Sequence, residues 1–348
     1  MRKDRYGFGI VGCGVISPVH AEAIRSLPNA DLKMVCDLDE GKAMALAGRF
    51  GCDWTTEYPT LLERGDVDVV NVLTWSGTHA DIGIDVARAG KHVIVTKPID
   101  VKVEKIDALI RVCRRHGVKL GATHQFRSYT IYRDLKDAID SGHFGQLILG
   151  NAFVKWWRDQ AYYDSASWRG TWEYDGGCLM NQAIHYLDLL TWMMGPADRV
   201  AGFMDARYHE MEAEDMAAAC VHFDSGAMGV IQATTSAFQG LPARLEIHGE
   251  RGNAIVEGDR LVYCDAAGGC LGPVAEGGET AAADARAGLD SAVPAHAEQI
   301  ADVITAIEED REPRINGAEA RKAVELTLAI YRAAQTGEQI SLPLVPLL

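Results

Sequence analysis

Residues 6–17 read YGFGIVGCGVIS, and this stretch decides the fold of the first part of the chain. Apolar residues run up to Val11, and the turn that follows contains the pattern G-x-G-x-x-S. The next segment, HAEAIRSL, has the composition of a helix. A strand, a glycine turn and a helix in this order predict a dinucleotide site, because Gly12 permits the tight turn and Gly14 lets a pyrophosphate approach the backbone at the positive helix end.

The residues around this turn complete the predicted cofactor site. Ser17 stands where the pattern usually has Gly or Ala, which is a mild departure because Ser is still small enough for helix–strand packing. Asp37 ends the second strand pattern, where an acid accepts hydrogen bonds from the adenosine ribose and repels a 2′-phosphate. No Arg follows it directly, so the sequence favours NAD over NADP. The cofactor-binding residues predicted here are Gly12, Gly14, Val15, Ile16 and Asp37.

Strand and helix patterns alternate as far as about residue 121, which indicates a parallel, doubly wound sheet. Extended stretches joined by turn signals such as Asp224-Ser225-Gly226 then follow, and two helical segments, 295–310 and 317–337, close the chain. We therefore predict an α/β protein with an N-terminal Rossmann domain over 1–121. The rest, 122–348, is predicted to be an α+β domain with a largely antiparallel open sheet, whose C-terminal helix can pack back on the first domain.

Composition narrows the class of protein. The chain has 348 residues, of which 48% are apolar, enough for two sizeable cores. It shows no apolar run of about 18 residues, no signal-peptide core, and no zinc-like spacing among its eight cysteines, so we expect a cytoplasmic protein without a membrane span or metal site. The net charge of −15 argues against nucleic acid or an anionic membrane as partner. Residues 265–292, rich in Ala and Gly, are predicted to be a surface loop.

A lysine follows another predicted strand, in VIVTKPID over residues 93–100. In an open parallel sheet, ligands bind at the carboxyl ends of the strands. Lys97 at such an end can hydrogen-bond a substrate hydroxyl. A plain surface lysine at a strand exit explains the same spacing equally well.

Polar residues also interrupt the apolar stretch 176–188, GGCLMNQAIHYLD. In a regular α-helix Asn181, His185 and Asp188 share one face, and the other faces are apolar. A polar stripe on a buried helix must be satisfied, and lining a wet cavity is one way. On the residues alone, a solvated edge or a core histidine bonded to backbone is the simpler interpretation.

Several stretches together resemble the Gfo/Idh/MocA family of NAD(P)-dependent sugar and polyol dehydrogenases: GIVGCG, GTHADIGIDVARAGKHVIVTKP, and the final stretch 296–337. The stretch 160–190 is similar to the nucleotide-sugar 3-dehydrogenase branch. The resemblance implies that Lys97 contacts the reacting hydroxyl, that His185 faces the nicotinamide, and that the open sheet forms a homodimer or homotetramer. Two positions depart from the family: Thr96 replaces the usual Glu before the lysine, and Asn181 replaces the usual Asp before the histidine.

Further side chains are candidates for the site. Arginine holds phosphate or carboxylate in bidentate fashion, and aromatic rings pack on sugars, uracil or nicotinamide, although ordinary core packing explains the aromatics as well. The predicted substrate-binding residues are Arg127, Tyr163, Arg169, Asn181 and Gln182. The further cofactor-binding residues are Thr74, His79, Lys97 and Trp168. Tyr162, Trp172 and His296 are weaker candidates.

The function predicted from these residues is NAD-dependent oxidation of a secondary sugar hydroxyl, by the resemblance C3 of UDP-N-acetylglucosamine or its uronic acid, with Lys97 and His185 as catalytic residues. Three alternatives remain open at this point. One is a dehydrogenase or ketoreductase of another sugar or cyclitol, the second is a redox-neutral NAD-dependent glycosidase, and the third is a non-catalytic sugar sensor on the same scaffold.

Overall fold

The computed structural model describes residues 3–269 and 292–344. The chain divides into two compact units, Met1–Ser128 with Gly288–Arg321, and Tyr129–Ala287 with Lys322–Leu348. The loop predicted over 265–292 lies mostly outside the described residues. No helix in the described part of the chain is both long and apolar enough to span a membrane.

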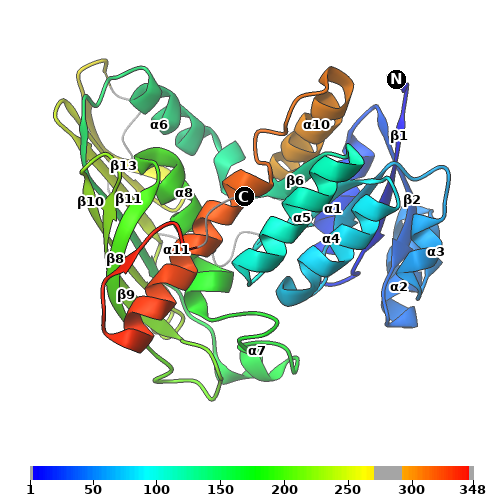
Figure 1. Cartoon of the computed structure of the whole chain (residues 1–348), viewed down its shortest axis with the longest axis horizontal. Coiled ribbons are helices and arrows are strands. Elements are labelled where there is room, and N and C mark those ends of the chain that lie inside the picture. The colour runs from blue at the N-terminus through cyan, green and yellow to red at the C-terminus, as the bar shows by residue number, and fades with distance from the viewer. Residues whose placement is uncertain (1–2, 270–291, 345–348) are drawn as a thin grey trace. The chain divides into compact units, whose positions relative to one another are not determined.

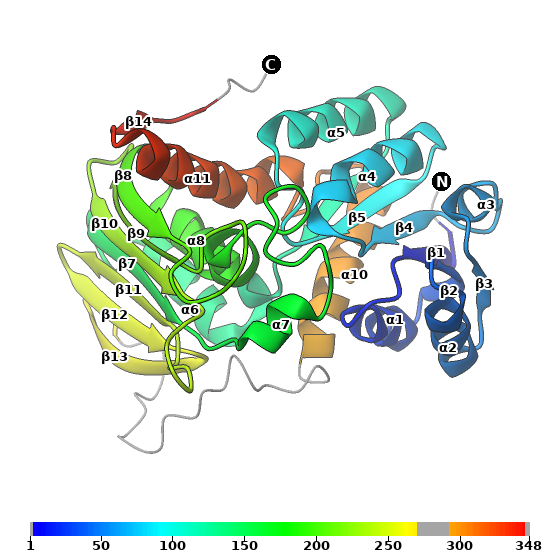
Figure 2. The same cartoon turned by 90° about the horizontal axis from the view of Figure 1, so that it is seen from below.

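The first unit contains a six-stranded, wholly parallel sheet in the order β3-β2-β1-β4-β5-β6, which confirms the predicted doubly wound fold. Its strands are β1 (Tyr6–Val11), β2 (Ala30–Cys36), β3 (Asp53–Thr55), β4 (Val69–Val72), β5 (His92–Thr96) and β6 (Leu120–Thr123). Its helices are α1 (Ser17–Ser26), α2 (Glu40–Phe50), α3 (Tyr58–Leu62), α4 (His79–Arg88), α5 (Val103–His116) and α10 (Val293–Glu309), with short 3-10 turns at Ser76–Thr78 and Gln125–Ser128. Figure 2 shows α4 and α5 on one face of this sheet and α1, α2 and α10 on the other.

Helix α10 belongs to the first unit although it lies late in the chain. Its residues Ile300 and Val303 share one hydrophobic core with Phe8 and Ile10 of β1. The contact is close, because a Cβ on Gly121 would lie 2.5 Å from the Val303 side chain. The compact units therefore do not follow a single cut after residue 121, since apolar burial ties this late helix to the parallel sheet.

The second unit contains an eight-stranded sheet in the order β13-β12-β11-β7-β10-β9-β8-β14. Only β7 and β10 pair in parallel among these strands, so the prediction of a largely antiparallel open sheet is confirmed. The strands are β7 (Leu147–Lys155), β8 (Ala197–Asp205), β9 (Met216–Phe223), β10 (Met228–Thr234), β11 (Arg244–Gly249), β12 (Gly252–Glu257), β13 (Arg260–Ala266) and β14 (Ile340–Ser341). The helices are α6 (Thr130–Asp140), α7 (Gln160–Asp164), the π-helix Cys178–Ala183, α8 (Ile184–Met194) and most of α11 (Gly317–Thr336).

The two faces of this second sheet differ. Buried and exposed residues alternate along β9 and β10. Helix α8 packs on the buried face, where a Cβ on Gly150 would lie 2.6 Å from the Met194 side chain. No described helix covers the other face (Figure 1), so the sheet is a half-covered layer of the kind expected from alternating strands.

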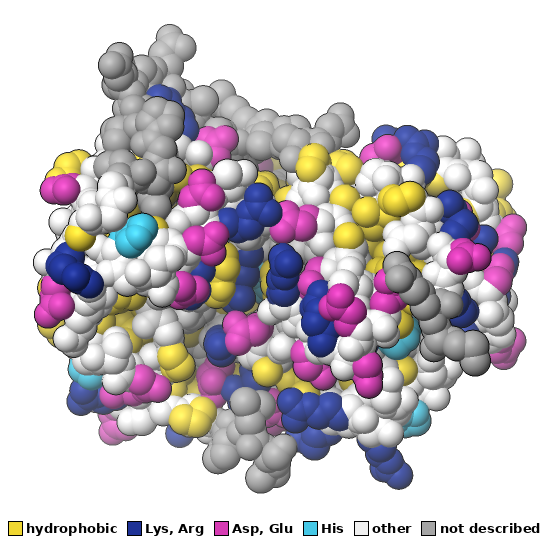
Figure 3. All heavy atoms as spheres, turned by 90° about the horizontal axis from the view of Figure 1, so that it is seen from above, with side chains coloured by type: hydrophobic (Ala, Val, Ile, Leu, Met, Phe, Trp, Pro, Cys, Tyr) yellow, Lys and Arg dark blue, Asp and Glu magenta, His cyan; other side chains and the backbone are white. Residues whose placement is uncertain are grey.

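Charged side chains are mixed on the molecular surface. On the face shown in Figure 3, basic and acidic groups lie interspersed over both units. The net charge of −15 therefore does not appear on that face as one continuous acidic area.

Candidate active site

The glycine turn after β1 has the shape that a dinucleotide requires. Gly12 has φ +101°, and a Cβ there would lie 2.6 Å from the Leu73 carbonyl oxygen, so only glycine fits. A Cβ on Gly14 would meet nothing within 4 Å, which leaves open space above the loop. The Ser17 hydroxyl donates to the Gly14 carbonyl at 2.7 Å and holds the turn at the start of α1. The departure at Ser17 thus provides an additional hydrogen bond.

Asp37 lies beside this loop at the end of β2. One carboxylate oxygen accepts from the Cys13 N–H at 2.7 Å, and the other accepts from the Asp39 N–H at 2.9 Å. Two apolar side chains next to these residues in the chain are exposed to solvent, Leu38 with 86% of its surface and Val15 with 71%. This combination of exposed apolar groups, an acid and an open glycine turn fits the adenosine half of NAD. The adenine base packs on apolar surface, and the ribose hydroxyls donate to the acid.

Thr74 and His79 lie near the carboxyl end of β4. The Thr74 hydroxyl is 2.8 Å from the Thr78 hydroxyl. The two ring nitrogens of His79 lie 2.9 Å from the Thr74 carbonyl oxygen and 2.8 Å from that of Pro98. Burial lowers the pKa of His79, and its ring nitrogens face the backbone, so this residue ties the end of β4 to the Lys97-Pro98 segment.

Lys97 follows β5 directly and is half-buried. Thr96, which replaces the usual Glu, is buried at the end of the strand. Asp100 anchors the segment after the lysine, because its carboxylate accepts from the backbone N–H groups of Ala80, Val101 and Lys102. Burial raises the pKa of Asp100 to about 6.

Two other predicted residues of the first unit are built into its interior. Arg127 is buried and pairs with Glu319 at 3.3 Å. His296 is buried at the start of α10, where its Nδ1 lies 2.8 Å from the Ala292 carbonyl oxygen and its ring packs edge-on against His20 at 4.8 Å. Burial lowers the pKa of both histidines, so they are neutral members of this core.

In the second unit, the stretch predicted as one regular helix begins as a π-helix over Cys178–Ala183 and continues as α8. The shared face predicted for Asn181, His185 and Asp188 assumes 3.6 residues per turn, which does not hold across Cys178–Ala183. Asn181 is half-buried, whereas His185 and Asp188 are buried in α8. π-Turns of this kind are frequent at functional sites.

A buried carboxyl group, which the sequence patterns did not predict, anchors the start of this π-helix. One oxygen of Glu214 accepts from the Leu179 N–H at 2.7 Å and from the Tyr331 hydroxyl at 3.0 Å. The Glu214 backbone carbonyl accepts from the Cys178 N–H at 2.8 Å. Burial raises the pKa of Glu214 to about 8. Two adjacent acids, Glu214 and Asp215, before an apolar strand are the sequence signal that could have pointed to it.

The structure brings several predicted polar residues together beside the π-helix. Asn181 donates to the Asp175 carboxylate. Gln182 donates to the Tyr162 hydroxyl at 2.9 Å, and Arg169 donates to the same hydroxyl at 2.7 Å. Trp168 lies under the Arg169 guanidinium, 4.7 Å from ring centre to carbon.

Two other predicted aromatic residues of this unit, Tyr163 and Trp172, do not hydrogen-bond to the Tyr162 hydroxyl in the described part of the chain. Tyr163 is buried, and its hydroxyl lies 2.7 Å from the Thr235 hydroxyl. Trp172 is partly exposed and packs edge-on against Tyr331 at 5.1 Å. The structure thus gives the Tyr163 hydroxyl a partner inside the unit itself.

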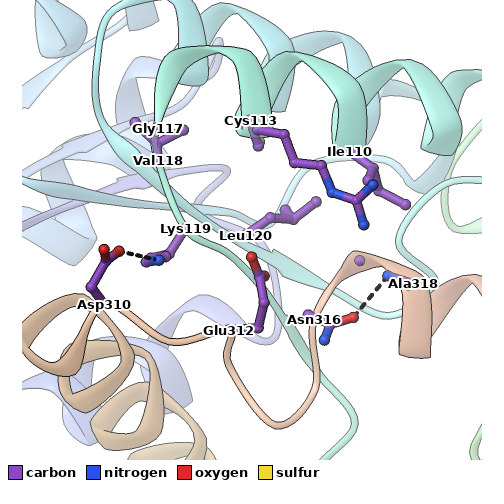
Figure 4. Close-up of a pocket in the computed structure, with 12 residues that line it drawn as sticks. Ile110, Cys113, Gly117, Val118, Lys119, Leu120, Asp310, Glu312, Asn316 and Ala318 are labelled. Atoms are coloured by element: carbon purple, nitrogen blue, oxygen red, sulfur yellow. Dashed lines mark hydrogen bonds and ion pairs between the residues drawn. The ribbon is translucent and has the colours of Figure 1, made fainter.

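One pocket of about 260 Å³ lies elsewhere in the first unit, between the end of α5, β6 and residues 310–318. Figure 4 shows Lys119 paired with Asp310 along it, at 2.7 Å. None of the predicted site residues lines this pocket.

Comparison with known proteins agrees with this geometry. Residues 6–124 match the oxidoreductase family with an NAD-binding Rossmann fold, and residues 132–255 match the GFO/IDH/MocA C-terminal domain. The chain belongs to the GFO/IDH/MocA oxidoreductase family. It is an NAD-dependent oxidoreductase of the sugar and cyclitol class.

Individual relatives span the whole chain. The WlbA dehydrogenase from Bordetella pertussis, solved with NADH and UDP-GlcNAcA, is 33% identical with a TM-score of 0.89, covering 99% of this chain and 100% of that one. The WlbA dehydrogenase from Chromobacterium violaceum, solved with the same two ligands, is 31% identical with a TM-score of 0.89, covering 99% and 98%. The inositol 2-dehydrogenase of Rhizobium meliloti is 28% identical, covering 96% of this chain and 98% of that protein.

Proposed function

We propose that this protein oxidises the C3 hydroxyl of a nucleotide sugar, UDP-N-acetylglucosamine or its uronic acid, with NAD as the oxidant. One observation carries the proposal. The WlbA dehydrogenase solved with NADH and UDP-GlcNAcA is similar over the full length, at 33% identity, which exceeds the 28% of the inositol dehydrogenase. The half-buried Asn181 and the buried Gln182 on the π-helix are the features of this chain that resemble that branch.

Within this proposal, Lys97 and His185 are the catalytic residues. Lys97 lies at a strand carboxyl end of the first sheet, where its ammonium group would donate to the reacting oxygen. His185 lies in the first turn of α8 and would accept the hydroxyl proton on a ring nitrogen. NAD, when bound, supplies the hydride acceptor. The residues of this chain that would hold it are the turn from Gly12 to Ile16 and Asp37.

The second candidate is oxidation of a cyclitol such as an inositol. The observation in its favour is the full-length similarity to the Rhizobium meliloti inositol 2-dehydrogenase. A cyclitol is uncharged, so the two candidates differ in whether the substrate brings an anionic group.

The test is to incubate the protein with NAD and, separately, UDP-N-acetylglucosamine, its uronic acid, and myo-inositol, following the absorbance band of reduced nicotinamide. We expect NADH to form with one of the nucleotide sugars. NADH formation with myo-inositol alone would overturn the proposal and support the second candidate. Turnover of a glycoside without release of NADH would point to a redox-neutral reaction instead.

We also propose that the uncovered face of the second sheet binds another copy of this chain. Phe203 of β8 is 82% exposed there, and Met228 of β10 is 58% exposed. Cross-strand register aligns Phe203, Ala218 and Gln232 in one row across β8, β9 and β10. It aligns Ala201, Cys220 and Val230 in a neighbouring row, so these side chains share one face. A wide face of small and apolar residues is unusual on a monomer, and a self-complementary patch of this kind suits a symmetric dimer or tetramer.

A further inference from the structure

Two arginines of the second unit lie over one tyrosine ring. The guanidinium carbon of Arg169 is 4.3 Å from the centre of the Tyr162 ring, and that of Arg158 is 5.2 Å from it. Gln182 joins the group, because it accepts from Arg158 Nη2 at 3.1 Å and donates to the Tyr162 hydroxyl at 2.9 Å. The four side chains, Arg158, Tyr162, Arg169 and Gln182, are here called the arginine–tyrosine cluster.

The cluster has positive charge without matching negative charge. Within the described residues, neither Arg158 nor Arg169 has a carboxylate within ion-pairing distance, although the chain has 49 acidic and only 34 basic residues. The carboxylate of the nearby Asp175 is bonded to Asn181 and to the Gly170 N–H. Two half-buried guanidinium groups that share one tyrosine ring repel one another, so a bound anion would stabilise this arrangement.

The cluster also has unused hydrogen-bond donors. Arg158 Nε is buried and has no partner among the described residues. Arg169 uses Nε on the Ser165 hydroxyl and Nη1 on Tyr162, which leaves Nη2. The Tyr162 oxygen accepts from both Arg169 and Gln182, so its own O–H remains available as a donor. Because burial raises the pKa of Tyr162, this hydroxyl stays protonated at neutral pH.

From these observations we propose that the arginine–tyrosine cluster is an oxyanion site, which holds a carboxylate or phosphate group of the substrate. A buried donor left unpaired is costly, and an oxyanion supplies the acceptors that three donors require. Gln182 is part of the cluster and immediately follows Asn181 on the π-helix, so the bound anion would position the sugar relative to the helix that carries His185. This inference rests on the proposed function, which supplies the sugar substrate. It adds that the enzyme selects that substrate by its carboxylate or phosphate group.

The experiment measures binding rather than turnover, so that its outcome does not depend on which hydroxyl is oxidised. NADH-loaded protein is titrated in a calorimeter with three probes: UDP, UDP-N-acetylglucosamine, and UDP-N-acetylglucosaminuronic acid. The variants are Arg158→Met and Arg169→Met. The matched control is Arg207→Met, which removes one positive charge at an exposed position of the same unit. Tyr162→Phe, which deletes only the hydroxyl, serves as the milder change if a methionine variant fails to fold.

The two sources of the anion give different results. If the cluster holds the sugar carboxylate, each methionine variant binds the uronic acid about 10- to 100-fold more weakly and binds the other two probes as the wild type does. If it holds the diphosphate, binding of all three probes weakens by about that factor. Either result supports the oxyanion site. Binding equal to that of the Arg207→Met control for all three probes, or no binding of any probe by the wild type, would overturn it. Tight binding in this titration, together with no NADH formation in the separate assay with NAD, would support the oxyanion site and reject the proposed oxidation.

Discussion

The backbone N–H of Cys13 donates to the carboxylate of Asp37 at 2.7 Å, so the glycine turn is tied directly to the end of β2. The carboxylate therefore holds the loop in place, and we propose that it also accepts hydrogen bonds from the ribose of NAD. The same hydrogen bond makes the cofactor site sensitive to a change at one residue.

Replacement of Asp37 by Asn should weaken NAD binding by about 10- to 100-fold, because a charge-assisted hydrogen bond contributes about 1.5–3 kcal/mol. Loss of the negative charge should also narrow the preference for NAD over NADP, since a 2′-phosphate is no longer repelled. Fluorescence titration with both reduced cofactors measures these effects. Asp66→Asn, which removes an exposed acid of the same unit, is the control. Unchanged affinity in Asp37→Asn would remove this residue from the cofactor site.

Replacement of His185 by Asn should lower kcat by about 10²–10⁴-fold, because a positioned base contributes that factor. The Kd for NADH should stay the same, since in our proposal the glycine turn of the first unit holds the cofactor. His222→Asn is the matched control, as His222 pairs with Asp198 on β8. If Asn at position 185 turned over normally, His185 would have no part in proton transfer.

The stability of the protein should depend on pH through Glu214. Its folded pKa of about 8 lies above the ordinary value of 4.5, so the folded state binds more protons than the unfolded state between those values. The contribution of this proton to stability is complete below about pH 4.5. The free energy of unfolding then falls as the pH rises from about 4.5 to about 8, by at most about 5 kcal/mol. Glu214→Gln should therefore lose less stability than the wild type between about pH 5 and about pH 9.

Urea unfolding of both proteins at those two pH values measures the difference. Glu210→Gln, an exposed acid of the same unit, should follow the wild type. A parallel pH dependence of the wild type and Glu214→Gln would contradict the assignment of a protonated, buried carboxyl group.

Replacement of Phe203 by Asp should reduce the molecular mass of the assembly in solution. A carboxylate on the uncovered face of the second sheet would be buried against another copy with no opposite charge beside it, which is unfavourable. Light scattering coupled to gel filtration checks the mass. Tyr208→Asp is the control, since Tyr208 is similarly exposed but lies in a loop. An unchanged mass in Phe203→Asp would show that this face is not the interface.

The sequence predicted the first sheet well because its determinants are local. The glycine turn, the acid at the end of β2 and the alternation of strand and helix each depend on residues close together in the chain. The sequence did not predict that α10 completes the core around β1, because burial of Ile300 against β1 is a contact between residues about 290 positions apart, for which periodicity carries no signal.

The sequence by itself determined the class of fold, the NAD-binding turn and the identity of the polar residues on the stretch 176–188. Only the tertiary structure decided how those residues are arranged. It bends Cys178–Ala183 into a π-helix held by Glu214 and Tyr331, and it stacks Arg158 and Arg169 on Tyr162. The physical reason is that a turn depends on the conformational freedom of its own residues, whereas the pairing of a buried charge or donor depends on groups that long-range folding brings to it.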